Sequence, residues 1–158
     1  MSAKTNAVRI IEQAGISYRE AYYEYDEKDL SGIHAAEALG FPAEQVFKTL
    51  VARGERNGIH VFCIPVCCEL DLKKAAKAAG DKNMELVAVK ELLALTGYIR
   101  GGCSPIGMKK QFPTVIDSSA ESKETITVSG GKIGTQVELS PADLSRLVRA
   151  KYAEVTTK

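Results

Sequence analysis

The sequence predicts one α/β (α+β) domain spanning residues 1–158, in which a mixed, barrel-like β-sheet is flanked by short helices. The 158 residues are enough for one sizeable hydrophobic core, and 45% hydrophobic with 26% charged residues is ordinary for a globular protein. Segments with the two-residue alternation of strands outnumber short helical segments and interleave with them. No repeat, linker or low-complexity tract divides the chain, so we expect a single domain.

The individual elements follow from periodicity and from the residues that start or stop a helix. Ser31 and Asp71 are typical capping residues before helical segments, and Gly15, Gly40 and Gly80 are typical stops after them. The predicted helices cover 5–14, 32–39, one or two turns from Pro42, 72–79 with Leu72 on its apolar side, 90–95 and, with Pro141 in its first turn, 141–150. The predicted strands cover 16–25, 46–52, 59–65, 84–87, 98–100, 114–116, 125–128, 135–139 and 152–155, with a hairpin turn at Asn57-Gly58.

Composition also restricts the class of protein. No stretch approaches the ~20 apolar residues of a membrane span. Residues 1–15 lack the apolar centre of a signal peptide. We therefore expect a cytoplasmic protein without a membrane partner. A net charge of +1 is low for a protein that wraps a long phosphate backbone, so any contact with nucleic acid should be local.

The cysteines and the lysine-rich helix each allow a plain and a functional interpretation. Four cysteines in such a chain are expected to be free thiols, and His60, Cys63, Cys67 and Cys68 match no standard zinc spacing, so no metal or cofactor is predicted. A basic stripe follows Asp71 on one side of its helix. It is either a solvated face or a tRNA phosphate contact, and it consists of Lys73, Lys74 and Lys77.

Lys48 lies inside an apolar strand. Alternation places it on one face with Leu50, while Thr49 lies on the other, and both faces are mostly apolar. A buried ammonium group is unfavourable unless it finds an acceptor. Lys48 therefore either extends its head group to water or to a carboxylate, or it meets an acceptor in a ligand.

Two glycine pairs each follow a predicted strand: Gly101-Gly102 and Gly130-Gly131. Glycine at such positions allows close approach of the backbone to a ligand, and successive N–H groups can bind a phosphate or a developing oxyanion. With Lys48 and nearby hydroxyl groups, they indicate a pocket for an anion or an ester. The hydroxyl groups are those of Thr49, Ser104 and Ser129.

Four motifs together resemble one known family. They are F-K-T-L-V at 47–51, D-L-K-K-A-A at 71–76, G-G-C-S-P-I-G at 101–107 and V-S-G-G-K at 128–132. In this order they are similar to the YbaK-type aminoacyl-tRNA deacylases, relatives of the editing domain inserted in bacterial prolyl-tRNA synthetases. The resemblance runs nearly end to end.

The resemblance implies a mixed-sheet α/β fold with a pocket for the 3′ end of a mischarged tRNA. It places the essential lysine at Lys48 with Thr49 beside it, and an aromatic pocket residue at Tyr25, with Tyr23 as the alternative. The other implied pocket residues are Gly101, Gly102, Ser129, Gly130 and Gly131. The implied enzyme acts in trans beside prolyl-tRNA synthetase, as a transient partner, on Cys-tRNA(Pro) or also on Cys-tRNA(Cys).

The resemblance also implies a mechanism. The thiolate of the esterified cysteine attacks its own carbonyl, and Lys48 acts either as a charged clamp or as a base, of which we favour the clamp. Cys103 is an alternative nucleophile, but it occupies the variable position of the glycine motif. Three alternatives to this activity remain: a deacylase for another small amino acid such as alanine, a non-catalytic tRNA-end or nucleotide-binding module, and a protein-docking role for the basic stripe. Oligomeric state is not predicted.

Overall fold

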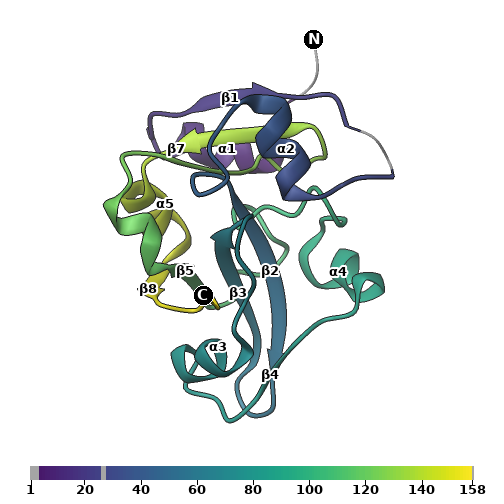
Figure 1. Cartoon of the computed structure of the whole chain (residues 1–158), viewed down its shortest axis with the longest axis vertical. Coiled ribbons are helices and arrows are strands. Elements are labelled where there is room, and N and C mark those ends of the chain that lie inside the picture. The colour runs from purple at the N-terminus through teal and green to yellow at the C-terminus, as the bar shows by residue number, and fades with distance from the viewer. Residues whose placement is uncertain (1–3, 26–27, 158) are drawn as a thin grey trace.

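The strands form two sheets, with helices packed around them (Figure 1). The structure is a computed structural model and describes residues 4–25 and 28–157. The antiparallel three-stranded sheet contains, in spatial order, β1 (Arg19–Tyr22), β7 (Thr135–Leu139) and β6 (Ile126–Ser129). The five-stranded sheet contains β4 (Met84–Leu86), β2 (Phe47–Gly54), β3 (Gly58–Pro65), β5 (Thr114–Asp117) and β8 (Lys151–Ala153). Pairing is antiparallel between β4, β2 and β3 and parallel between β3, β5 and β8, which confirms the predicted mixed α/β fold.

Most predicted helices form, and the predicted caps start them. The helices are α1 (Asn6–Gln13), α2 (Gly32–Leu39), α3 (Leu72–Ala78), α4 (Val89–Thr96), α5 (Pro141–Val148) and the 3-10 helix η1 (Ser118–Ser122). The side chains of Ser31 and Asp71 accept hydrogen bonds from backbone N–H groups of the first turns of α2 and α3. Gly40, in the left-handed conformation, ends α2 as predicted.

Two predicted elements are absent from the described chain, one because a distant segment uses its backbone and one because it closes a local turn. The residues after Pro42 form a turn and not a helix, since the Gln45 carbonyl accepts from Thr127 N–H and the chain enters β2 at once. The predicted strand 98–100 is a turn in which the Gly102 N–H donates to the Ile99 carbonyl.

The predicted hairpin between β2 and β3 forms at the end of the long ribbon in Figure 1, next to α3. Gly58 adopts a φ of 72°, which glycine tolerates without strain. The Asn57 side-chain amide donates to the carbonyls of Ala79 and Gly80 at 3.0 Å, so the C-terminal end of α3 is fixed to the hairpin turn. The other end of β2, starting at Phe47, lies near α2.

Two of the four apolar clusters found among the described residues show how the sheets and helices are held together. One lies between the three-stranded sheet, α1 and α5, and its largest members include Phe47, Ile126 and Leu144. The other packs the alanine face of α3 on the five-stranded sheet. The predicted apolar side of α3 is wrong at Leu72, which is 42% exposed, because the short helix packs through smaller side chains.

Candidate functional site

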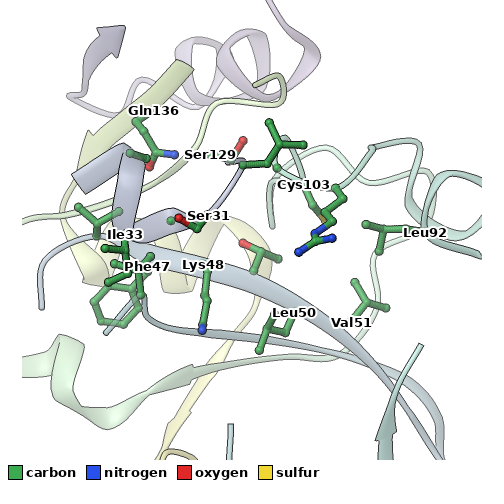
Figure 2. Close-up of a pocket in the computed structure, with 18 of the residues that line it drawn as sticks. Ser31, Ile33, Phe47, Lys48, Leu50, Val51, Leu92, Cys103, Ser129 and Gln136 are labelled. Carbon is green, nitrogen blue, oxygen red and sulfur yellow. The ribbon is translucent and has the colours of Figure 1, made fainter. Parts of the chain in front are cut away.

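A cavity of about 600 Å³ lies along the open edge of β2 (Figure 2). β4 pairs with β2 at residues 52–54, and β6 bridges to Val46 just before β2, so the part of β2 between these contacts, which includes Thr49, has no neighbouring strand on that side in the described structure. The cavity wall is formed by residues 46–51 with Val66, by Leu30, Ser31, Gly32, Ile33 and Ala35, by Leu86, Val87, Val89 and Leu92, by Arg100, Gly101 and Cys103, and by Tyr23, Ser129 and Gln136.

The backbone of Thr49 is exposed to this cavity. The carbonyl of Val51 accepts from Val87 N–H at 3.0 Å, so Val51 points its backbone groups away from β3. Because alternate residues of a strand point their backbone groups to the same side, Thr49 does the same. No backbone partner for Thr49 N–H is found within residues 4–25 and 28–157. This N–H group is therefore a donor available to a ligand.

The Thr49 side chain adds a second unsatisfied group. Its hydroxyl oxygen is buried and has no hydrogen-bond partner in the described part of the chain. Thr49 lies opposite Cys63 in the strand pairing. Burial raises the pKa of the Cys63 thiol to about 12, and the nearby Thr49 hydroxyl acts on this pKa in the opposite sense. A buried unsatisfied hydroxyl is unfavourable by about 1–3 kcal/mol, which a ligand group could recover.

Lys48 lines the cavity and is half-buried. Figure 2 shows its side chain extending away from Ser129 and Cys103, on the face of β2 opposite to Thr49. Burial raises the pKa of the Cys68 thiol, and the Lys48 ammonium acts on it in the opposite sense. Lys48 has no hydrogen bond or ion pair among the described residues, so no contact found there holds its four-carbon chain in this orientation.

The loops that carry the two glycine pairs meet, but of the four glycines only Gly101 lines the cavity. A Cβ atom on Gly102 would lie 3.0 Å from the backbone nitrogen of Ile133, so the two loops touch through their backbones. Gly130 N–H donates to the Thr135 carbonyl and Gly131 N–H to the Ser129 hydroxyl.

The N–H group of Gly102 is also used, by the Ile99 carbonyl. Of the four glycine N–H groups, only that of Gly101 lacks a partner in the described structure. The N–H groups of Gly101 and Thr49 are therefore available to a ligand in the cavity wall, whereas the N–H groups of the second glycine pair are used within the chain.

The two serines of the predicted site differ in position. Ser129 lines the cavity, and its hydroxyl oxygen accepts from Gly131 N–H at 3.2 Å, which leaves its proton free for a ligand. Ser104 is fully buried outside the cavity wall and accepts from Ile106 N–H at 3.2 Å. Ser104 thus shapes the loop rather than facing the cavity.

The structure places Tyr23 in the cavity wall, not Tyr25. Tyr25 is 48% exposed, and its ring lies beside Gly134. Tyr23 N–H donates to the Gly134 carbonyl, and its ring meets His34 edge to face at 6.4 Å. Burial raises the pKa of the Tyr23 phenol, so this group can donate a hydrogen bond at neutral pH.

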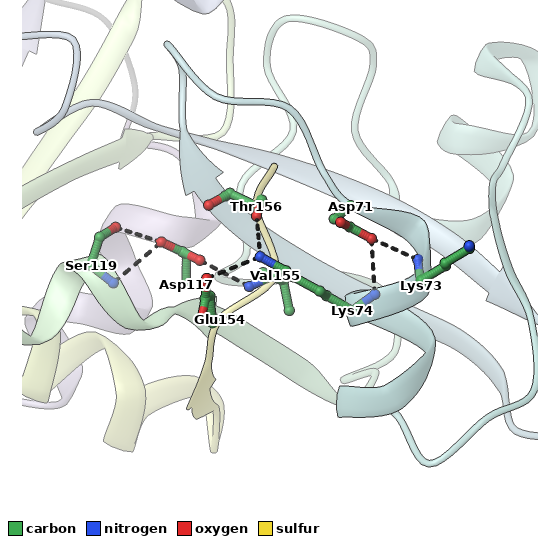
Figure 3. A network of polar contacts seen from close by, with 8 residues as sticks. All are labelled: Asp71, Lys73, Lys74, Asp117, Ser119, Glu154, Val155 and Thr156. Atoms are coloured by element: carbon green, nitrogen blue, oxygen red, sulfur yellow. Dashed lines mark hydrogen bonds and ion pairs between the residues drawn. The ribbon is translucent and has the colours of Figure 1, made fainter. Parts of the chain in front are cut away.

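The basic stripe lies away from the cavity. Lys74 donates to a carboxylate oxygen of Glu154 and to the Thr156 carbonyl, each at 2.9 Å (Figure 3). Lys73 and Lys77 are exposed on α3, which is fixed to the hairpin turn at the far end of β2. A role of this stripe in binding tRNA stays a prediction.

Arg100 is a cavity residue that the sequence motifs did not indicate. It is exposed at the cavity wall, directly before Gly101, and this adjacency was the available signal. Among the described lining residues, Arg100 and Lys48 carry charge and none is a carboxylic acid. The cavity is thus suited to an anionic ligand.

No group of three potential metal ligands comes together within the described residues. The four cysteines are free thiols. None of the described helices has the length and apolar character needed to cross a membrane.

Comparison with known proteins identifies the family. The model of the aminoacyl-tRNA editing domain matches residues 30–147. The chain belongs to this family. A relative in Enterococcus faecalis, named as a candidate Cys-tRNA(Pro)/Cys-tRNA(Cys) deacylase, EbsC, is 50% identical over 155 residues, which cover 98% of this chain and 94% of the relative.

Two further similarities connect this editing domain to proline charging. A solved structure described as a candidate trans-editing enzyme for prolyl-tRNA synthetase has 25% identity and a TM-score of 0.82, covering 99% of this chain and 100% of its own. The proline–tRNA ligase of Brachyspira hyodysenteriae is 25% identical over 137 residues, which cover 81% of this chain but 24% of the ligase.

Proposed function

We propose that this editing domain is a free-standing deacylase that removes cysteine from mischarged tRNA, with Cys-tRNA(Pro) as the main substrate and Cys-tRNA(Cys) as a second. The observation that carries the proposal is the cavity of about 600 Å³, with cationic side chains at its wall and unpaired backbone donors beside them. A volume of this order is typical of sites for small ligands and cofactors, and suits a terminal aminoacyl-nucleoside. The 50% identity to EbsC over nearly both whole chains supports the choice of cysteine.

The proposed reaction uses the chemistry of the substrate. The cysteine sulfur forms a bond to its own ester carbon, the bond from that carbon to the ribose oxygen breaks, and the thiol proton ends on the ribose hydroxyl. The products are a four-membered thiolactone, which water later opens, and free tRNA. Holding the reacting groups together can lower such a barrier by ~7–11 kcal/mol in favourable cases, although ring strain offsets part of this.

The chain supplies stabilisation of charge in this scheme. The N–H groups of Thr49 and Gly101 are the proposed donors to the oxyanion that forms on the carbonyl oxygen. Lys48 is proposed to rotate toward the bound ester as a charged clamp, which requires breaking no hydrogen bond or ion pair found in the described chain. Ser129 would orient the amino acid.

The proposed setting is the cytoplasm, where the enzyme would meet mischarged tRNA leaving prolyl-tRNA synthetase. Contact with the synthetase would be transient. The similarity to a solved structure described as a candidate trans-editing enzyme for prolyl-tRNA synthetase supports action from a separate chain.

The test is a multiple-turnover deacylation assay on matched Cys-, Ser- and Ala-tRNA(Pro). We expect rapid turnover of Cys-tRNA(Pro) and slow turnover of the other two, because serine offers a hydroxyl that is far harder to ionise than a thiol (pKa ~8.5) and alanine offers neither. Turnover of alanine and serine at the rate of cysteine would reject the substrate-assisted route. Absence of turnover on every substrate would favour a non-catalytic tRNA-end module.

The Lys48→Ala variant tests the clamp in the same assay. We expect kcat/KM for Cys-tRNA(Pro) to fall by about 100-fold or more, as for loss of a group that stabilises transition-state charge. The matched control is Lys151→Ala, which removes an exposed lysine of β8 outside the cavity wall and should leave turnover unchanged. Equal activity of both variants would contradict the proposed role of Lys48.

A further inference from the structure

Arg100 stands at the tip of a tight turn on the cavity wall. The Gly102 N–H donates to the Ile99 carbonyl at 3.0 Å, so Arg100 and Gly101 are the two central residues of a β-turn. Gly101 has a φ of 86°, the left-handed conformation that a type II turn needs at its second central position. The sequence Arg-Gly-Gly therefore fixes where the arginine side chain begins.

The backbone beneath Arg100 is held from two sides. A Cβ atom on Gly101 would lie 3.3 Å from the Leu30 side chain and 3.4 Å from that of Ile133. Gly102 is in contact with the backbone of Ile133. A side chain at Gly102 would crowd this backbone, and the φ of 86° favours glycine at position 101, so the turn forms a stable base for a long cationic side chain.

The charge of Arg100 is not balanced within the described chain. Arg53 pairs with Glu91 and Arg146 with Asp143, whereas residues 4–25 and 28–157 provide no ion pair or hydrogen bond for Arg100. Its guanidinium is exposed beside a cavity whose described wall has no carboxylate. Guanidinium groups bind phosphate oxygens through two parallel hydrogen bonds, which suits this position.

We propose that Arg100 binds a phosphodiester group at the 3′ end of the acylated tRNA and thereby sets the depth at which the aminoacyl ester enters the cavity. The inference rests on the proposed function and assigns a binding residue to it. Arg100 and Gly101 are consecutive residues, so a phosphate bound by the guanidinium would lie near the N–H group of Gly101, which has no partner in the described structure. Lys48 reaches the same cavity from β2. In this arrangement Arg100 binds the backbone phosphate, and the ester lies in the interior of the cavity.

A substrate without phosphate distinguishes a contact of Arg100 with phosphate from a contact with the ester or the adenosine. Deacylation of Cys-tRNA(Pro) is compared with that of cysteinyl-adenosine, which has a free 5′ hydroxyl, for the wild type, Arg100→Gln and Arg100→Lys. We expect Arg100→Gln to lower kcat/KM for the tRNA by about 10- to 100-fold, mainly through KM, and to leave cysteinyl-adenosine within about twofold. Arg100→Lys should retain part of the affinity, because lysine keeps the charge but not the paired geometry.

Binding of uncharged tRNA(Pro), measured by fluorescence anisotropy at several salt concentrations, tests the contact without catalysis. The slope of log K against log salt should be smaller by about 0.7 in Arg100→Gln, as expected for loss of one phosphate contact on a single strand. The control Arg56→Gln removes an exposed arginine of the hairpin turn, away from the cavity, and should leave the slope unchanged.

The outcomes distinguish this inference from the proposed function. Equal losses on both substrates, or an unchanged salt slope, would overturn the phosphate contact while deacylation by the wild type stands. If the wild type cleaves neither substrate, the proposed function fails, and a reduced salt slope in Arg100→Gln would still support the contact. Thermal unfolding of each variant confirms that it is folded.

Discussion

Cys103 is a thiol in the cavity wall, and burial raises its pKa to about 11. A thiol must ionise to act as a nucleophile, and no described group beside it acts as a base. We therefore expect Cys103→Ala to keep deacylation of Cys-tRNA(Pro) within about threefold of wild type in a steady-state assay. A loss beyond about 100-fold, with a covalent thioester detected by mass spectrometry, would assign the nucleophile to the enzyme.

Four of the predicted site residues, Lys48, Thr49, Gly101 and Ser129, line the cavity, because motif residues on a strand and at its loops keep their local geometry. Their roles in binding and catalysis stay predictions. The resemblance did not decide between Tyr23 and Tyr25, because two-residue alternation places both on the same face of a strand. β1 ends at Tyr22, so both tyrosines lie beyond the strand, and the path of the loop decides which of them reaches the cavity.

The hydrogen bonds of the glycine N–H groups could not be predicted from the sequence. The sequence suggests that both glycine pairs offer donors, yet the N–H groups of Gly102, Gly130 and Gly131 are used by the chain itself. Such bonds depend on loop conformations that no local pattern specifies.

At the scale of elements, the contact between the two glycine loops supports the site. A Cβ atom on Gly102 would lie 3.0–3.1 Å from three backbone atoms of Lys132 and Ile133, none of which can rotate away. We expect Gly102→Ala to separate the loops, to destabilise the fold by about 1–3 kcal/mol and to lower deacylase activity, although Gly102 does not line the cavity. Chemical denaturation and the deacylation assay measure the two effects.

The matched control is Gly40→Ala at the end of α2. Gly40 has a φ of 74° but nothing within 4 Å of a Cβ atom. This variant should lose about 1–2 kcal/mol from backbone strain and keep the kcat/KM of the folded enzyme. The same loss of activity in both variants would mean that stability, and not the loop contact, controls the site.

Element ends were predictable where a side chain caps them, as Ser31 and Asp71 do. The segments at Pro42 and at 98–100 were not. The Gln45 carbonyl accepts from Thr127 N–H, a partner that becomes available only in the folded chain, whereas the Ile99 carbonyl closes a local turn with Gly102 that the strand-like pattern did not indicate.

At the scale of the whole molecule, the arrangement of the strands lies beyond local patterns. β3 and β5 are far apart in sequence and pair in parallel, and an isolated bridge between Val46 and Thr127 joins the two sheets. The C-terminal segment is held by Asp117, whose buried carboxylate accepts from Val155 N–H at 3.1 Å (Figure 3). The class of fold follows from the mixture of elements, but this topology depends on which surfaces bury each other.

Two thiols and one phenol near the cavity are expected to make the stability of the fold decrease at alkaline pH. Burial raises the pKa of Cys63 to about 12, of Cys103 to about 11 and of Tyr98 to about 12, and Cys103 contributes to the other two shifts. The Tyr98 hydroxyl also donates to the Ile106 carbonyl at 2.5 Å, a bond that an ionised phenol cannot donate.

The sign of the pH effect follows from proton binding. Unfolded thiols and phenols lose their protons near pH ~8.5 and ~10, whereas these three groups keep theirs in the folded state to higher pH. The folded state then binds more protons, so stability is complete below about pH 8.5 and falls as pH rises through 9 to 11. Differential scanning fluorimetry should show a Tm that is flat from pH 7 to 8 and decreases steeply above 9.

Two variants, each with one cysteine replaced, test whether the Cys103 thiol causes this decrease in Tm. Cys103→Ala lowers Tm at pH 7 through lost packing, but its Tm should decline less steeply above pH 9, because one group with a raised pKa is gone. Cys67→Ala removes an exposed thiol and should keep the wild-type slope. If all three proteins lose Tm with the same slope, the alkaline transition arises elsewhere. The thiols beneath the cavity would then ionise without opposing the fold, and Cys103 would again be a candidate nucleophile.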